Sequence, residues 1–87
     1  MYKIALARQA EKEYRDLFRR EKVIFVRIRK AIHAIAKDPR QGKALKFELK
    51  RLWSYRVGPY RIIYSIEHSI LTVYIIDIGH RREICRV

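Results

Sequence analysis

The chain has 87 residues, of which 49% are hydrophobic and 34% charged, so it can form one packed domain of residues 1–87 but not two. Its 21 Lys and Arg outnumber its 9 Asp and Glu, which gives a formal net charge of +12 that is spread along the chain. This excess predicts a polyanionic partner, more often nucleic acid than a membrane. The alternatives are a domain that charge keeps soluble, or one that an acidic protein neutralises.

The few cysteines and histidines restrict the chemistry further. Cys85 is the single cysteine, which excludes an internal disulfide and a Cys-rich zinc site, and the three histidines lack metal-ligand spacing. We therefore predict no metal and no cofactor. No signal peptide is apparent, and no apolar run approaches the roughly 18 residues of a membrane span, so a cytoplasmic protein without a membrane partner is expected.

The N-terminal half predicts one strand and two helices. Residues 2–6 are short and apolar, as in a strand, and a helical pattern begins near Arg8. Residues 19–22 form a polar link to a second helix over 23–37, which Asp38-Pro39 ends because proline disfavours the helical conformation of the preceding residue. Both helices carry an apolar stripe, which consists of Ala10, Tyr14, Leu17 and Phe18 in the first and Ile24, Ile28, Ala31, Ile32 and Ile35 in the second. Lys30, His33 and Lys37 recur at helical spacing and predict a solvated outer face.

The C-terminal half predicts a sheet. Residues 40–50 are expected to form a loop that leads into a hairpin with strands over 52–57 and 60–67 around Gly58-Pro59. A turn at 67–69 precedes the strand 70–78, which is apolar at both parities and so is expected to be covered on both faces. Residues 79–82 read as a turn and 83–87 as a candidate last strand. The fold class is therefore α+β, with an N-terminal strand, a two-helix hairpin and a three- to four-stranded antiparallel sheet.

The hairpin places two arginines beside each other. If Val57 pairs with Tyr60, then Arg56 lies directly opposite Arg61, and like charges in such a pair destabilise a sheet. No acid occurs between Glu48 and Glu67 to neutralise them. An external anion such as a phosphate is the natural partner, although both guanidinium groups could instead extend into water.

Other bases could converge on this pair. His80, Arg81 and Arg82 follow the last long strand, and Lys46 and Lys50 precede the hairpin. Phosphodiester cleavage needs positive charge on the phosphate together with a proton acceptor and a proton donor. With RNA, the 2′-OH can be the nucleophile without a metal. His80 has a suitable intrinsic pKa, but a lone exposed histidine is usually inert, so binding without catalysis stays open.

Two segments, LKFELKRLWSYRVGPYRIIYSI and LTVYIIDIGHRREIC, resemble the RelE/ParE superfamily of toxins from toxin–antitoxin systems. The resemblance covers essentially the whole chain and implies the RelE-like fold. Its RelE-like branch consists of metal-independent endoribonucleases that cut messenger RNA on the ribosome and so inhibit translation. Its ParE branch inhibits DNA gyrase instead.

The resemblance also implies site residues. Arg61 falls on the phosphate-stabilising arginine, Arg56 on a basic position implicated in activity, and Arg81 on the arginine of the last motif. Together these three favour the RelE-like branch. Lys46, Lys50, Arg82 and Cys85 are expected to bind RNA.

One position departs from the family pattern, because Cys85 stands where many active members carry a tyrosine. A thiol neither stacks like a phenol nor shares its pKa, so the proton-transfer residue stays open, with His80 as a candidate. A gyrase inhibitor, a weakly active or inactive homologue, and a non-toxic nucleic-acid-binding domain are the alternatives. The expected partners are the ribosome, messenger RNA and a cognate acidic antitoxin that folds on binding, with operator DNA contacted only through the antitoxin complex.

Overall fold

The elements of the protein form one sheet with two helices packed against it. The structure is a computed structural model that describes residues 1–45 and 51–80. In chain order, the elements are β1 (Lys3–Leu6), α1 (Arg8–Arg20), α2 (Lys22–Lys37), the 3-10 turn η1 (Pro39–Gln41), β2 (Lys43–Ala44), β3 (Trp53–Val57), β4 (Tyr60–Glu67), the 3-10 turn η3 (His68–Ile70) and β5 (Thr72–His80). The α+β class predicted from the sequence is confirmed.

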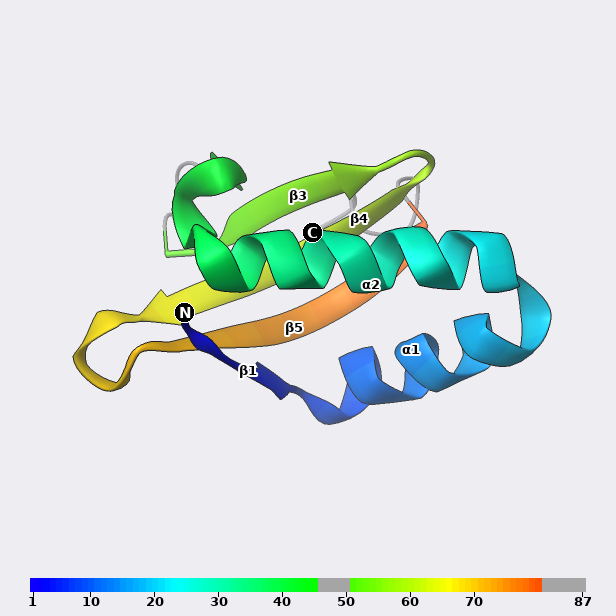
Figure 1. Ribbon diagram of the computed structural model, residues 1–87, viewed down its shortest axis with the longest axis horizontal. Helices are drawn as coiled ribbons and strands as arrows, with labels where there is room; N and C mark the ends of the chain where they lie inside the picture. Colours follow the sequence, from blue (N-terminus) through cyan, green and yellow to red (C-terminus); the bar gives the residue numbers. More distant parts are fainter. Residues whose placement is uncertain (46–50, 81–87) are drawn as a thin grey trace.

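The sheet is mixed and has the strand order β1-β5-β4-β3-β2 among the described residues. The strands β3, β4 and β5 pair antiparallel, as predicted, and β2, which lies in a segment predicted to be a loop, pairs antiparallel with β3. The strand β1 pairs parallel with β5, with Ile4 opposite Val73. The N-terminal strand therefore joins the sheet that the C-terminal half builds. Both helices lie on one face of this sheet (Figure 1).

The core lies between that sheet face and the helices. Leu17 of α1 and Ile28 and Ile35 of α2 are fully buried against Ile62 and Tyr64 of β4. The predicted apolar stripes therefore face the sheet, apart from Phe18, which is 53% exposed and packs edge-on against Phe25 instead. Each fully buried aliphatic side chain contributes about 1.5–3 kcal/mol relative to an exposed one.

Several element ends differ from the sequence prediction. The link between the helices is a single residue, Glu21, rather than residues 19–22. The helix does end before Asp38-Pro39, and the Asp38 carboxylate accepts a hydrogen bond from the Arg40 amide. The last described strand, β5, runs through Gly79 to His80, so the turn predicted at residue 79 is wrong. Backbone pairing with β4 explains this, because Arg61 and Tyr60 extend the ladder to these two residues.

The apolar run of β5 predicted that both faces of this strand would be covered, but the two faces are not covered equally. Val73 and Ile75 are buried, whereas Tyr74 between them is 46% exposed. A register shift between Ile63 and Tyr64 of β4 interrupts the alternation farther along the strand. Within the described residues, none of the helices is long and apolar enough to cross a membrane.

Candidate functional site

The β3–β4 hairpin sets the geometry of the candidate site. Val57 pairs with Tyr60 and Arg56 with Arg61, in the register that the sequence predicted. Gly58 takes a positive φ of 56° at the first turn position, where a residue with a Cβ would be strained. Because Val57 and Tyr60 face the helices, strand alternation places Arg56 and Arg61 on the opposite face of the sheet.

Arg61 has an unsatisfied donor. Its Nε is buried and has no hydrogen-bond partner, and neither Arg56 nor Arg61 forms an ion pair within the described part of the chain. A buried N–H without a partner costs about 1–3 kcal/mol, more for a charged group. An anion that accepted this hydrogen bond would remove that cost and the repulsion between the two guanidinium groups, and arginine offers the fork of donors that suits a phosphate.

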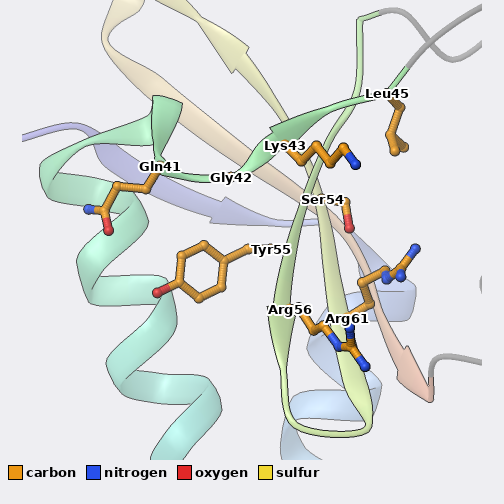
Figure 2. Close-up of a pocket in the computed structure, with 8 residues that line it drawn as sticks. All are labelled: Gln41, Gly42, Lys43, Leu45, Ser54, Tyr55, Arg56 and Arg61. Atoms are coloured by element: carbon orange, nitrogen blue, oxygen red, sulfur yellow. The ribbon is translucent and has the colours of Figure 1, made fainter.

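The two arginines line a hollow of about 630 Å³, which we call the main hollow (Figure 2). Its walls come from two segments that are adjacent only in the fold. The hairpin supplies Ser54, Tyr55, Arg56 and Arg61, and the segment after α2 supplies Gln41, Gly42, Lys43 and Leu45. Strand β2 brings them together, because Lys43 pairs with Ser54 of β3. With three cationic side chains and no acid among the described lining residues, the main hollow suits an anion.

Tyr64 holds the segment after α2 in place. Its hydroxyl donates a hydrogen bond to the Pro39 carbonyl at 2.6 Å and accepts one from the Gly42 amide at 3.2 Å. The side chain is fully buried and stacks on Trp53. Burial raises the pKa of Tyr64 to about 12, so the phenol stays protonated and is not a general acid near neutral pH.

His80 is not brought together with the arginine pair. It is the residue paired with Tyr60, and its ring packs edge-on against the Tyr60 ring, with 5.8 Å between the centroids. Tyr60 in turn donates a hydrogen bond to Glu21, the residue between the helices. Tyr60 and His80 therefore lie on the face of the sheet that the helices cover. The geometry therefore does not support His80 as the proton-transfer residue beside Arg61.

Gly79 rather than His80 is the β5 residue opposite Arg61. The end of β5 thus lies next to the arginine pair, as convergence of the last motif with the hairpin requires. The other predicted site residues, Lys46, Lys50, Arg81, Arg82 and Cys85, lie outside the described residues.

Two residues of the main hollow were not predicted from the sequence. Lys43 and Tyr55 line it, and besides the arginines they are the titratable groups among its described lining residues. Lys43 lies in a segment that was predicted to be a loop, and its place beside the hairpin depends on β2 pairing. A strand of two residues is too short for any local sequence pattern to predict it. Groups of three or more metal-ligating side chains do not occur among residues 1–45 and 51–80.

Comparison with known proteins identifies the family. Residues 4–85 match the family described as ParE toxin of type II toxin-antitoxin system, parDE. The chain belongs to the RelE/ParE family of toxins. It is thus a toxin of a type II toxin–antitoxin system, and the recognition made from the sequence is confirmed.

The relatives of this toxin include proteins of both the RelE-like and the ParE-like kind by name. Toxin RelG of Mycobacterium tuberculosis is 40% identical over 53 residues, which are 60% of this chain and 61% of RelG, less than two thirds of that relative's length. A chain of the toxin–antitoxin complex RelBE2 from Mycobacterium tuberculosis is 32% identical, with a TM-score of 0.76 over 92% of this toxin and 98% of that chain. The YoeB/ParE toxin from Agrobacterium tumefaciens shares the fold at 19% identity, with a TM-score of 0.81 over 91% and 98% of the two chains.

Proposed function

We propose that this toxin is an endoribonuclease that cuts messenger RNA on the ribosome and so inhibits translation. The observation that carries the proposal is the buried, unpartnered Nε of Arg61 in a hollow that Arg56 also lines. A site for a dianionic, pentacovalent phosphate needs donors that are already in position and not engaged elsewhere. Arg61 meets both conditions in the described part of the chain.

The reaction that this arrangement supports is attack of an RNA 2′-OH on the adjacent phosphorus. The 2′-oxygen loses its proton and bonds to phosphorus, the bond to the 5′-oxygen of the next nucleotide breaks, and that oxygen gains a proton. Negative charge on the non-bridging oxygens increases in the transition state, where Arg61 and Arg56 would stabilise it. A preorganised donor of this kind contributes about 2–4 kcal/mol, or about 10²–10³ in rate.

The partner proposed for the toxin is an acidic antitoxin. The net charge of +12 would be neutralised by an acidic segment, and the similar RelBE2 chain comes from a toxin–antitoxin complex. The complex would contact operator DNA only through the antitoxin. A salt-sensitive complex between the purified toxin and the product of the neighbouring gene is the expected result, and both proteins would act in the cytoplasm.

Primer-extension mapping of translated messages after induction tests the nuclease. Wild-type protein should introduce cuts, Arg61→Ala should not, and Arg15→Ala should cut like wild type because Arg15 is an exposed base on α1 outside the main hollow. Intact messages in cells that contain abundant, folded wild-type protein would contradict the proposal.

A second function is inhibition of DNA gyrase without nuclease activity. It is favoured by the match of residues 4–85 to the ParE toxin family and by Cys85 at the position of the usual tyrosine. A supercoiling assay separates the two functions. Gyrase inhibition by the purified toxin, together with uncut messages in cells, would replace the nuclease proposal.

A further inference from the structure

A basic groove leads away from the main hollow over the edge of β3. Beside that edge lies a second hollow of about 320 Å³, the edge hollow, to which α2 contributes Arg27 and Lys30 and β3 contributes Tyr55 and Arg56. Tyr55 and Arg56 also line the main hollow, so the two hollows meet at these residues. Figure 2 shows the Tyr55 ring on the other side of β3 from the Arg56 and Arg61 side chains, directed toward the helix side.

The groove continues along α2. A third hollow of about 420 Å³, the α2 hollow, is lined by Lys30, His33 and Lys37, and it reaches Gln41. Lys30 belongs to both the edge hollow and the α2 hollow, and Gln41 belongs to both the α2 hollow and the main hollow. Each hollow therefore shares at least one lining residue with each of the other two, and we call the edge and α2 hollows together the α2 groove.

The basic side chains of the α2 groove are arranged in a row. Lys30, His33 and Lys37 are three and four residues apart, which places them on one face of α2 over about 10 Å. All three are exposed, and none forms an ion pair within residues 1–45 and 51–80. Arg27 lies at the other end of the row, with its guanidinium 3.2–3.5 Å from the position that a Cβ on Gly58 would take.

We propose that the α2 groove binds the sugar–phosphate backbone of single-stranded RNA on one side of the phosphate held at Arg56 and Arg61. This inference rests on the proposed function, because it extends the same RNA strand beyond the cleavage site. Single-stranded nucleic acid is bound by a positively charged groove combined with aromatic side chains on which bases stack. Here Tyr55, partly exposed at the junction with the main hollow, is such an aromatic side chain.

The lining favours RNA over an acidic peptide. A helix or strand that docks in a groove needs apolar anchor pockets in addition to charge. The apolar side chains of the α2 groove are small or buried, since Ala31 is 6% exposed and Val57 6% exposed, and Ala34 is the remaining one. The groove therefore offers charge along its length and little hydrophobic surface.

A pair of charge-matched variants tests the inference. Lys30→Ala with Lys37→Ala removes two cations from the α2 groove, while Arg15→Ala with Arg19→Ala removes two exposed cations from α1, and Ala suits a helix at all four positions. The probes are two 2′-O-methyl oligouridylates, which lack the nucleophilic 2′-OH. One is a dinucleotide that fits only the main hollow, and the other is a decanucleotide that extends beyond it. Fluorescence anisotropy at several salt concentrations gives the affinity and its salt dependence.

The groove variant should lose affinity for the decanucleotide only. The logarithm of the binding constant falls as the logarithm of the salt concentration rises, and the loss of two phosphate contacts makes this slope shallower by about 1.4. That change corresponds to about 25-fold weaker binding at about 0.1 M salt. Its affinity for the dinucleotide should stay at the wild-type value, and the α1 variant should bind both probes nearly as wild type does. Equal decanucleotide binding by the two variants would overturn the inference. So would a groove variant that binds RNA normally but loses affinity for polyglutamate, because the surface would then serve an acidic protein.

Failure of this inference differs from failure of the proposed function. If Arg61→Ala cuts messages like wild type while the groove variant still loses decanucleotide affinity, the cleavage site is wrong and the groove stands. If Arg61→Ala is inactive and the groove variant binds the decanucleotide like wild type, the cleavage site stands and the groove is wrong.

Discussion

Arg56 and Arg61 are direct cross-strand partners on the sheet face opposite the helices, and the buried Nε of Arg61 has no hydrogen-bond partner among the described residues. This relationship predicts opposite effects of Arg61→Ala on stability and activity. Cleavage should fall by about 10²–10³ because a phosphate contact is lost. The melting temperature should stay the same or rise, since the change relieves a repulsion worth under about 1 kcal/mol and also removes a buried donor without a partner.

Arg61→Lys is the matched variant for this prediction, because it keeps the charge and removes the planar fork. We expect it to bind RNA better than Arg61→Ala and to cleave far more slowly than wild type. Melting of Arg61→Ala well below wild type would show that the arginine is structural. A stable Arg61→Ala protein with full activity would remove Arg61 from the site.

Tyr64→Phe should destabilise the protein and the wall of the main hollow together. The change removes the hydrogen bond to the Pro39 carbonyl and the one from the Gly42 amide, leaving both groups without this partner. The expected loss is about 1–3 kcal/mol in the free energy of unfolding, measured by urea denaturation. Tyr55→Phe is the control, because it removes a neighbouring hydroxyl that forms no hydrogen bond to η1, and it should unfold like wild type. Equal stability of Tyr64→Phe and wild type would show that the hydroxyl does not hold η1.

The same tyrosine predicts a fall in stability at alkaline pH. Its pKa is raised by burial from 10.0 in the unfolded chain to about 12 in the native protein. Between pH 10 and 12 the unfolded chain releases this proton and the native protein retains it, which favours unfolding as the pH rises. The contribution approaches about 2–3 kcal/mol at pH 12. The free energies of unfolding of wild type and Tyr64→Phe, measured by denaturation, should therefore converge as pH rises over this range. A difference between them that stays constant with pH would contradict this assignment of the pKa to Tyr64.

Gly42→Ala should be more disruptive than its size suggests. A Cβ at this position would lie 2.8 Å from the Ser54 carbonyl oxygen and would collide with the Tyr64 hydroxyl. The φ of Gly42 is −73°, so crowding rather than backbone strain causes the effect. We expect a lower melting temperature and weaker binding of the RNA dinucleotide, because Gly42 and Lys43 line the main hollow. Adding Tyr64→Phe should restore part of the stability, and no recovery would place the crowding at Ser54.

His80→Ala tests whether His80 transfers a proton, as the sequence suggested, or only packs against Tyr60, as its position in the structure indicates. Because the ring packs against Tyr60 on the helix side, we expect cleavage within a few fold of wild type, with a shift in melting temperature from the lost ring contact. A loss of cleavage approaching that of Arg61→Ala, with an unchanged melting temperature, would return His80 to the site.

The sequence by itself determined the local elements and the arginine pair. Alternation of apolar residues, the Gly58-Pro59 turn and the Asp38-Pro39 break act over a few residues, and each is fixed by local backbone preferences and side-chain periodicity. The register of Arg56 with Arg61 followed from the two-residue turn alone, since a turn of fixed length leaves one pairing. The family could be recognised for the same reason, because its hairpin motif is contiguous.

Only the tertiary structure decided which of the remaining basic residues accompany that pair. Parallel pairing of β1 with β5, the short strand β2 at the sheet edge and the continuation of β5 to His80 are non-local contacts, which no local pattern specifies. One step along a strand reverses the face of a side chain, and this places His80 on the helix side while Gly79 lies opposite Arg61. Likewise, Lys30 and Lys37 line a groove beside the hairpin because packing lays α2 alongside β3, whereas helical spacing alone predicted only an outer face.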